Sequence, residues 1–186
     1  WNMKDFSEFT MKNKKRDAEL SKFWKAEDNA FFNPRWGYKG DRGFDIWTKK
    51  AYGNFIVHYE YRSDHTKHDG NSGFYLRDQW EIQIEKRHGT DQKHGDGALY
   101  SLKAPSKVAK KKDPNAWNTI DARVEDMKIW VWQNGILIHD GVTLASRTDR
   151  HSTKTPKFSK GPFKFQGDHG QVWFRNLFIK ELPDTE

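Results

Sequence analysis

The chain has 186 residues and no cysteine, which fits one domain with its own core and excludes disulfide bridges, thiol nucleophiles and cysteine-ligated zinc. Only 34% of the residues are hydrophobic but 15% are aromatic, so large flat side chains must supply much of the buried area. The formal net charge of +7 is compatible with nucleic acid, an anionic membrane or an acidic polysaccharide as a partner.

Two basic runs, at 12–16 and 107–112, contribute to this charge. Neither contains the interleaved aromatic residues that line a single-strand-binding groove, so we expect solvated loops and no nucleic-acid partner. No segment approaches the ~20 apolar residues that a membrane span requires. The chain opens with Trp1 instead of Met, so we expect that an upstream piece is missing, for which a signal peptide is one candidate.

The first predicted element is one or two helical turns within 14–28. The later elements are short runs rich in β-branched and aromatic residues and separated by Gly, Asn, Asp or Pro clusters, which is typical of strands. These runs occupy 54–62, 73–77, 80–86, 117–125, 127–141, 161–167 and 172–182. Asn134-Gly135 predicts a two-residue hairpin turn, and 102–116 has the composition of a long exposed loop.

The strand-like runs follow one another without regularly alternating helices, which argues against a parallel sheet. The pattern therefore predicts an all-β fold, a two-sheet antiparallel β-sandwich of the jelly-roll type. Residues 1–186 contain no internal repeat and no linker, so we expect a single domain.

The run 80–86 has two chemically different faces. Trp80 and the two isoleucines lie on one side of an extended strand, while Glu81, Gln83 and Glu85 lie on the other. If the neighbouring runs pair with it, one sheet face carries seven polar side chains: Glu60, Arg62, Tyr75, Arg77, Glu81, Gln83 and Glu85. An ordinary solvated sheet surface shows the same alternation. However, carboxylate, guanidinium and amide groups beside aromatic walls also suit the hydroxyls and apolar ring faces of a sugar.

Paired carboxylates on this face suggest a glycosidase. Glu81 and Glu85 have Cα atoms about 13 Å apart on a regular strand, whereas the carboxyl groups of a glycosidase pair lie roughly 5–9.5 Å apart. Glu81 with Glu60 from another strand is an equally good pair, and the sequence does not choose between them.

Histidines form a second candidate set. His65 and His68 stand three residues apart with acidic neighbours within 63–70, which suggests either a divalent-metal site or a polar loop. In 166–170, glycines flank Asp168 and His169, so His169 is a candidate acid or base, or else a group that stabilises a turn. No cofactor is predicted with certainty, and a divalent metal ion stays an open alternative.

Eight motifs in order along the chain resemble the bacterial 3-keto-disaccharide hydrolase domain family, whose fold is similar to that of the concanavalin A-like lectins and glucanases. The two most specific are "NSG" before a strand and "DHGQVWFRN" near the end. The motifs occupy 23–31, 47–62, 71–77, 80–85, 97–106, 116–125, 134–141 and 161–182.

The resemblance implies a β-sandwich whose concave sheet holds a carbohydrate, and a secreted or periplasmic bacterial protein. It also implies cleavage of glycosides oxidised at C3, by removal of the C2 proton, elimination and hydration. Such chemistry needs a base, a group that stabilises the enolate and a proton donor. By residue type, Glu81 is the candidate base, Arg62 or Arg77 the stabilising group, and His169 or Glu60 the acid.

Further candidates contact the sugar, with Glu85 as an additional carboxylate. They are Trp47, Asn71, Tyr75, Gln83, Trp117, Gln166 and Arg175. The family pattern has Asp where this chain has Glu85, and the segment 64–69 lengthens the loop before "NSG". These departures from the family pattern bear on the identity of the substrate more than on the fold.

Three alternatives to elimination stay open. Direct hydrolysis by two carboxylates would use the same polar face. A non-catalytic carbohydrate-binding module would keep aromatic platforms such as Trp47, Tyr75 and Trp117 without a carboxylate of shifted pKa. A domain that recognises acidic polysaccharide would account for the net charge of +7.

Overall fold

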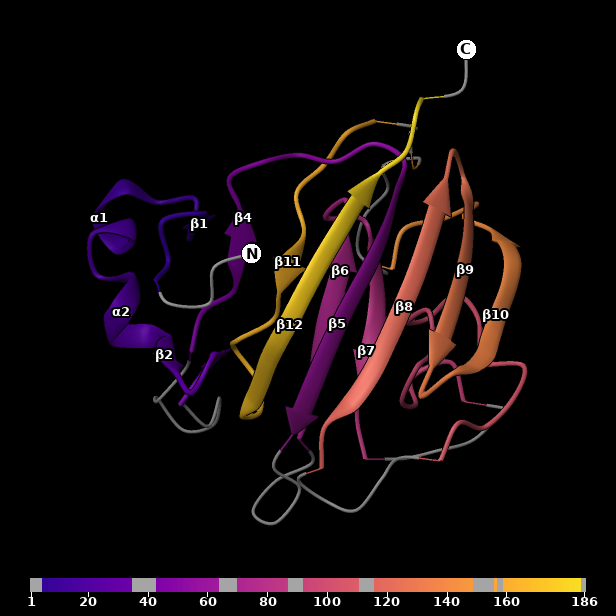
Figure 1. Cartoon of the computed structure of the whole chain (residues 1–186), viewed down its shortest axis with the longest axis horizontal. Helices are drawn as coiled ribbons and strands as arrows, with labels where there is room; N and C mark the ends of the chain where they lie inside the picture. The colour runs from indigo at the N-terminus through magenta and orange to yellow at the C-terminus, as the bar shows by residue number, and fades with distance from the viewer. Residues whose placement is uncertain are drawn as a thin grey trace.

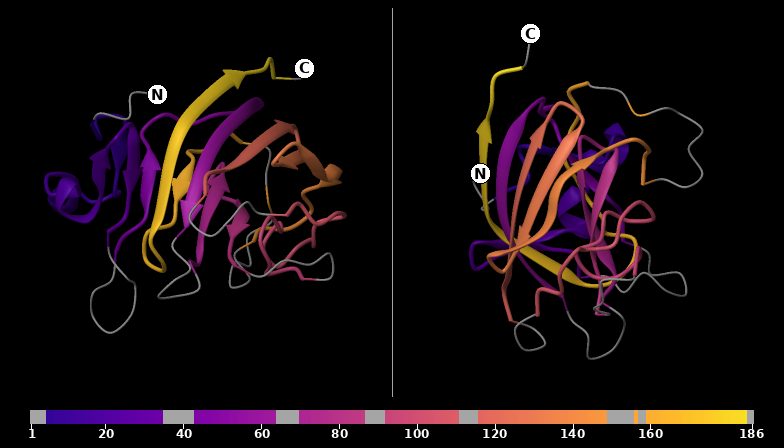
Figure 2. Two further views of the ribbon diagram at one scale, coloured as in Figure 1. Left: turned by 60° about the horizontal axis from the view of Figure 1, so that its bottom comes forward. Right: turned by 90° about the vertical axis from the view of Figure 1, so that its right-hand side faces the viewer.

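The computed structural model describes residues 5–34, 43–63, 70–86, 92–110, 116–148, 156 and 159–184. In these parts the chain forms two antiparallel sheets, and Figures 1 and 2 show one sheet packed against the other. The five-stranded sheet has the order β1-β4-β11-β6-β7, and the seven-stranded sheet has the order β10-β9-β8-β5-β12-β3-β2. The predicted two-sheet antiparallel β-sandwich is therefore confirmed.

The chain crosses several times from one sheet to the other. In order they are β1 (Phe9–Thr10), α1 (Lys14–Asp17), α2 (Leu20–Phe23), β2 (Lys25–Glu27), β3 (Ala30–Phe32), β4 (Ile46–Thr48), β5 (Phe55–Ser63), β6 (Ser72–Leu76), β7 (Trp80–Ile84), β8 (Asn118–Glu125), β9 (Lys128–Gln133), β10 (Ile136–Thr143), β11 (Lys164–Phe165) and β12 (Val172–Glu181).

The helical prediction for 14–28 is correct in its first part. Asn13 caps α1 by accepting hydrogen bonds from the N–H groups of Lys15 and Arg16 at 3.1 and 3.2 Å. The last part of this segment forms β2. Neither helix, nor any other in the described residues, is long and apolar enough to cross a membrane.

The hairpin of β9 and β10 turns at Asn134 and Gly135, as predicted. Both residues have positive φ, 49° and 78°, which a type I′ turn requires at its two central positions. Asn tolerates this conformation and Gly adopts it without steric cost.

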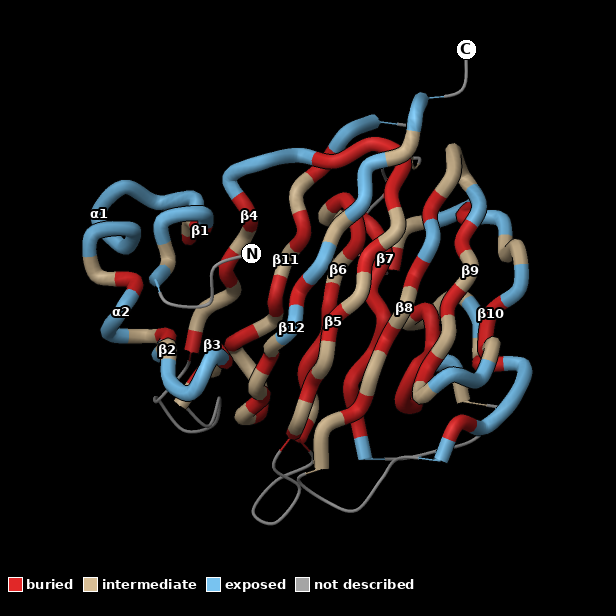
Figure 3. The backbone as a smooth tube through the Cα atoms, in the orientation of Figure 1, coloured by how far each residue is buried: buried red, intermediate tan, exposed pale blue. Residues whose placement is uncertain are grey.

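Aromatic side chains fill the space between the sheets. Tyr59 of β5 lies 4.3 Å from Phe74 of β6, and Phe165 of β11 lies 5.0 Å from Phe174 of β12, both measured between ring centroids. Figure 3 shows the resulting alternation of buried and less buried residues along β5 and β8. The inner faces of both sheets are thus committed to the core, and only their outer faces can bind a ligand.

The prediction that seven polar side chains share one face is wrong. β5, which carries Glu60 and Arg62, lies in the seven-stranded sheet between β8 and β12. β6 and β7, which carry Tyr75 and Glu81, lie in the other sheet. The two-residue period correctly separates the inner and outer sides of each strand. It does not determine which strands are neighbours, and the two outer faces of a sandwich point in opposite directions.

Arg77 also departs from the predicted face. It lies beyond the end of β6 with a φ of 53°, so the strand alternation no longer applies to it. Its guanidinium is buried and donates to the carbonyl oxygens of Gly53 at 2.8 Å and Asp126 at 2.7 Å, and to Asn54 Oδ1 at 3.0 Å. Arg77 therefore ties the turn after β6 to the start of β5 and to the turn after β8.

We expect Arg77→Met to lower the free energy of unfolding by about 2–4 kcal/mol, because it leaves buried carbonyl acceptors without a donor. Urea unfolding monitored by tryptophan fluorescence measures this change. The matched control is Arg123→Met, since Arg123 is half exposed and pairs with Glu125 on the surface. The control should change stability by less than about 1 kcal/mol. Equal losses in the two variants would contradict the structural role of Arg77.

Candidate functional site

Four side chains form a row across the outer face of the five-stranded sheet. The register pairs Lys164 of β11 with Trp47 of β4 on one side and with Tyr75 of β6 on the other, and pairs Tyr75 with Glu81 of β7. Their strand neighbours, such as Phe74 and Ile82, are fully buried in the core, so this row points away from it. We call these four residues the Glu81 row.

A second row lies beside it. Gln166 donates its backbone N–H to the carbonyl of Gly73 at 3.0 Å, and Gly73 pairs with Gln83 on β7. A Cβ at position 73 would lie 2.0 Å from Glu81 Oε1. The carboxylate of Glu81 therefore lies over Gly73, and the glycine of the "NSG" motif supplies the space that this side chain occupies.

Burial dominates the electrostatics of Glu81. The residue is only 3% exposed, and this desolvation raises the pKa of Glu81 to about 7. The hydroxyl of Tyr75 donates a hydrogen bond to the carboxylate, and this bond and the charges of Lys164 and His169 act in the opposite direction. A carboxyl group with a pKa near neutrality can both accept and return a proton at physiological pH.

Lys164 brings a positive charge to the same place. Its ammonium group lies 3.4 Å from the centroid of the Tyr75 ring and 3.2 Å from Asp45 Oδ2. The Lys164 and Asp45 side chains are mostly buried, and desolvation raises the pKa of Asp45 although the charge of Lys164 opposes this. Lys164 is thus held in a fixed position on the Glu81 row, where its charge acts on the Glu81 carboxylate.

Asp168 and His169 complete the charged part of the site. Nδ1 of His169 bonds to Oδ1 of Asp168, and this bond raises the pKa of His169 despite partial burial. The negative charges of Asp45 and Glu81 raise it further. Burial acts to raise the pKa of Asp168, but the bond to His169 and the nearby positive charges lower it overall. The arrangement favours an imidazolium beside a carboxylate.

Seven of the predicted site residues lie on or beside this face. They are Trp47, Asn71, Tyr75, Glu81, Gln83, Gln166 and His169. Gln83 Nε2 donates to Asn71 Oδ1 at 3.1 Å, and Trp47 Nε1 donates to Asp78 Oδ1 at 2.8 Å. Oε1 of Gln166 is buried and accepts no hydrogen bond within the described parts of the chain. An amide oxygen of this kind is available to a ligand hydroxyl.

The other predicted residues lie elsewhere. Glu85 is buried just beyond the end of β7, and its N–H donates to Asp96 Oδ1 at 2.9 Å. Arg77 lies in the turn described above. Four residues lie on the outer face of the seven-stranded sheet: Glu60, Arg62, Trp117 and Arg175. A catalytic pair of Glu81 and Glu60 is therefore wrong, because their side chains lie on opposite sides of the sandwich.

Lys164 and Asp45 belong to the site but are not among the residues predicted from the sequence. The run 161–167 was predicted as a strand, and its alternation alone places Lys164 and Gln166 on the side opposite Phe165. Asp45 precedes β4, whose three residues are too few to show a period. Lys164 could therefore have been predicted from its place on the outer side of the predicted strand 161–167. No sequence pattern pointed to Asp45.

The described residues contain no group of three or more His, Cys, Asp or Glu side chains that could hold a metal ion. The metal site proposed for His65 and His68 falls within 64–69, which lies outside the described residues.

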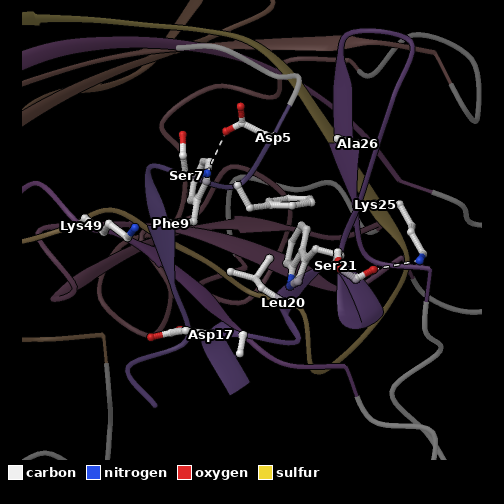
Figure 4. A pocket seen from close by; sticks show the side chains of 12 residues that line it. Asp5, Ser7, Phe9, Asp17, Leu20, Ser21, Lys25, Ala26 and Lys49 are labelled. Carbon is white, nitrogen blue, oxygen red and sulfur yellow. Dashed lines mark hydrogen bonds between the residues drawn. The ribbon is translucent and has the colours of Figure 1, made fainter. Parts of the chain in front are cut away.

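Two pockets lie near the N-terminal elements. The smaller, of about 190 Å³, shares Asp45, Trp47 and Asp168 with the site and is also lined by Met11, Arg16 and Phe44. The larger, of about 720 Å³, has an apolar wall of Phe9, Leu20 and Trp24 and a polar rim that includes Asp5 and Lys25 (Figure 4). Of the two, only the smaller adjoins the charged cluster and offers space for part of a substrate.

The buried Glu81 makes stability depend on pH. The folded state holds this proton more tightly than the unfolded chain, whose glutamates have a pKa of about 4.5. The stabilising contribution is therefore fully present below about pH 4.5 and is lost as the pH rises to about 7. We expect the free energy of unfolding of the wild type, relative to Glu81→Gln, to fall by about 3 kcal/mol across this window.

Urea unfolding at pH 4.5, 5.5, 6.5 and 7.5 measures this difference. Tyr75→Phe provides a matched comparison, because it removes the hydroxyl that lowers the pKa of Glu81 and should move the window to higher pH. A difference between wild type and Glu81→Gln that stays constant with pH would contradict the raised pKa.

The sequence of the chain matches a known protein family. The model of a family described as the 3-keto-alpha-glucoside-1,2-lyase-like domain matches residues 1–180. No curated protein matches the chain significantly by sequence. The family match indicates a protein of the glycosyl hydrolase type that acts on carbohydrate.

Solved structures share the fold. A candidate glycosyl hydrolase from Parabacteroides distasonis ATCC 8503 is 24% identical with a TM-score of 0.77, covering 98% of this chain and 82% of its own. A second candidate glycosyl hydrolase from this organism is 20% identical with a TM-score of 0.70. The match covers 98% of this chain and 92% of the chain of that structure. The carbohydrate-binding module CBM66 from Bacillus subtilis is 12% identical with a TM-score of 0.55, covering 95% and 98%. At these identities the likeness supports the fold alone.

Proposed function

The chain belongs to the 3-keto-alpha-glucoside-1,2-lyase-like family, and from this membership we propose that it cleaves glycosides whose sugar carries a ketone at C3. Cleavage proceeds by elimination across C1 and C2, followed by hydration, with Glu81 as the base. The observation that carries the proposal is a buried carboxyl group with a pKa of about 7, in a cluster with a fixed lysine and a histidine.

The ketone makes the C2 proton acidic, so a carboxylate can remove it. The electron pair of the C2–H bond passes through the enolate into the new C1–C2 double bond. The C1–O bond breaks, and its electron pair stays on the departing oxygen, which takes up a proton. Water then adds across the double bond to give the free keto sugar. Glu81 suits the first step because its pKa lies near neutrality, and a general base is most effective when its pKa is close to the pH of the reaction.

Lys164 supplies the charge that the enolate needs. Its ammonium group is already fixed by Asp45 and the Tyr75 ring, so little reorganisation is required when negative charge develops on the C3 oxygen. Residue type alone predicts Arg62 or Arg77 for this role, but both lie away from Glu81 in the structure. Lys164 replaces them in the proposal.

His169 is the proton donor to the departing oxygen. Its Nδ1 is engaged by Asp168, so Nε2 is the atom that carries the transferable proton. The bond to Asp168 raises the pKa of His169, which favours the protonated imidazole that an acid requires. Gln83, Asn71 and the free Gln166 oxygen bind hydroxyl groups, and Trp47 forms an apolar wall beside the 190 Å³ pocket.

The site favours this chemistry over the alternatives. A binding module has no need of a desolvated carboxyl group with a pKa near 7, which costs stability. Direct hydrolysis by Glu81 and Glu60 fails because the two side chains lie on opposite faces. The family resemblance further supports export to the periplasm or the medium in a bacterium, as part of the same proposal.

A product assay on matched glucosides, ordinary and 3-keto, tests the proposed function. We expect the wild type to cleave the keto substrate only, and Glu81→Gln to lower kcat by roughly 10²–10⁴, since the amide cannot accept the proton. In D₂O, early product should contain deuterium at C2, which direct hydrolysis does not introduce. Cleavage of the ordinary glucoside without such labelling would refute elimination, and sugar binding without cleavage of either would favour the binding module.

Lys164→Met tests the electrostatic role. We expect kcat on the keto substrate to fall about 100-fold with a smaller change in KM, because the charge is needed chiefly in the transition state. The matched control, Lys160→Met, removes an exposed lysine of the neighbouring segment that pairs with Asp184, and should retain full activity. Equal effects of the two variants would show that Lys164 has no specific role.

A further inference from the structure

A stack of aromatic and guanidinium groups lies on the outer face of the seven-stranded sheet. The Arg62 guanidinium lies 4.5 Å from the centroid of the Trp173 ring and 5.3 Å from that of Trp117. Trp173 stacks on Phe32 at 5.4 Å, and Arg175 lies 4.0 Å from Trp117. All five are partly exposed. We call them the Arg62 stack.

The register explains how the stack is built. Trp173 of β12 pairs with Arg62 of β5 on one side and with Phe32 of β3 on the other, so these side chains stand next to one another across three strands. Trp117 directly precedes β8, the other neighbour of β5. The rings of Trp173 and Phe32 stack with 20° between their planes, and a planar guanidinium such as that of Arg62 stacks readily on an aromatic face, which fixes its orientation.

The two arginines of the stack differ in their partners. Arg175 donates from Nε to Glu60 Oε2 at 2.8 Å, and its Nη2 lies at the same distance, so its charge is neutralised. Arg62 has no carboxylate partner among the described residues, and its Nε is buried without a hydrogen-bond acceptor there. A buried donor without an acceptor is costly and rare in native proteins. Arg62 is therefore a fixed cation with donors left for a ligand.

Two lysines lie on the elements at the two ends of the stack. Lys25 of β2 pairs with Phe32 and extends the row at one end of the stack. At the other end, Asn134 donates to the carbonyl of Lys110 at 3.1 Å and to Asn118 at 2.9 Å, which holds the 107–110 segment near Trp117. The protein as a whole carries a formal charge of +7. An anion is thus favoured here by the charge of Arg62 and by the overall charge.

We propose that the Arg62 stack binds carboxylate-bearing sugar units of an acidic polysaccharide. The planar guanidinium fork matches a carboxylate, to which it donates two parallel hydrogen bonds. The exposed indole faces of Trp117 and Trp173 contact the apolar faces of pyranose rings. This surface lies on the opposite side of the sandwich from Glu81 and does not depend on the proposed reaction. It holds the protein on a polymer while the Glu81 face stays accessible.

Binding to polygalacturonate and to its fully methyl-esterified form tests this proposal, because esterification removes the charge and keeps the sugar chain. In low salt we expect the acid form to bind at least about tenfold more tightly, and Arg62→Gln to abolish most of this preference. Arg62→Lys should retain only part of it, since a lysine keeps the charge but loses the fork. Thermal unfolding of each variant checks that the fold is intact.

The matched control is Arg123→Gln, which removes another arginine from the outer face of this sheet, one that pairs with Glu125 and lies 5.7 Å from the Trp130 ring. It should bind the acid polymer as the wild type does, and so should Glu81→Gln. Equal binding of both polymer forms, or an equal loss in Arg123→Gln and Arg62→Gln, would overturn the proposal. Equally tight binding of polyglutamate, which has carboxylates and no sugar rings, would overturn the assignment to a glycan.

Discussion

The site depends on the burial of one carboxyl group on the outer face of a sheet. Such a face normally exposes its polar residues to water, yet Glu81 is 3% exposed. Burial is possible because Gly73 leaves room beneath the carboxylate, Tyr75 donates a hydrogen bond to it and Lys164 lies nearby. The remaining cost of burying the charged carboxylate raises the pKa of Glu81 to about 7. This shift lowers the stability of the protein when Glu81 is ionised, and it also makes Glu81 a suitable base.

The sandwich architecture imposes a second constraint. Because aromatic side chains such as Phe74, Phe165 and Phe174 occupy the space between the sheets, functional groups are confined to two outer faces that do not communicate directly. The five-stranded sheet carries the buried, electrostatically coupled cluster around Glu81. The seven-stranded sheet carries a more open surface in which arginines stack on indoles. Desolvated groups suit chemistry, whereas rigid exposed groups suit recognition of a large polymer.

Much of the fold could be predicted from local sequence, and the limits of that prediction have physical causes. Alternation in 80–86 correctly separated Ile82 from Glu81, and Asn134-Gly135 correctly located a turn because its positive φ angles demand those residue types. Strand neighbours could not be predicted, since pairing between β5 and β12 joins segments more than a hundred residues apart. The short strands β1 and β4 escaped prediction because two or three residues show no period.

The arginines show why residue type alone assigns function poorly. Arg77, Arg175 and Arg62 are all predicted to contact substrate, yet among the described residues only Arg77 and Arg175 have hydrogen-bond acceptors for their donors. Backbone carbonyls engage the donors of Arg77, and Glu60 engages those of Arg175. Among the described residues Arg62 is held by the ring faces of Trp117 and Trp173, which fix the guanidinium and leave its Nε without an acceptor there. An arginine can donate hydrogen bonds to a ligand only from N–H groups that the fold leaves unsatisfied, and contacts between residues distant in sequence decide which groups those are.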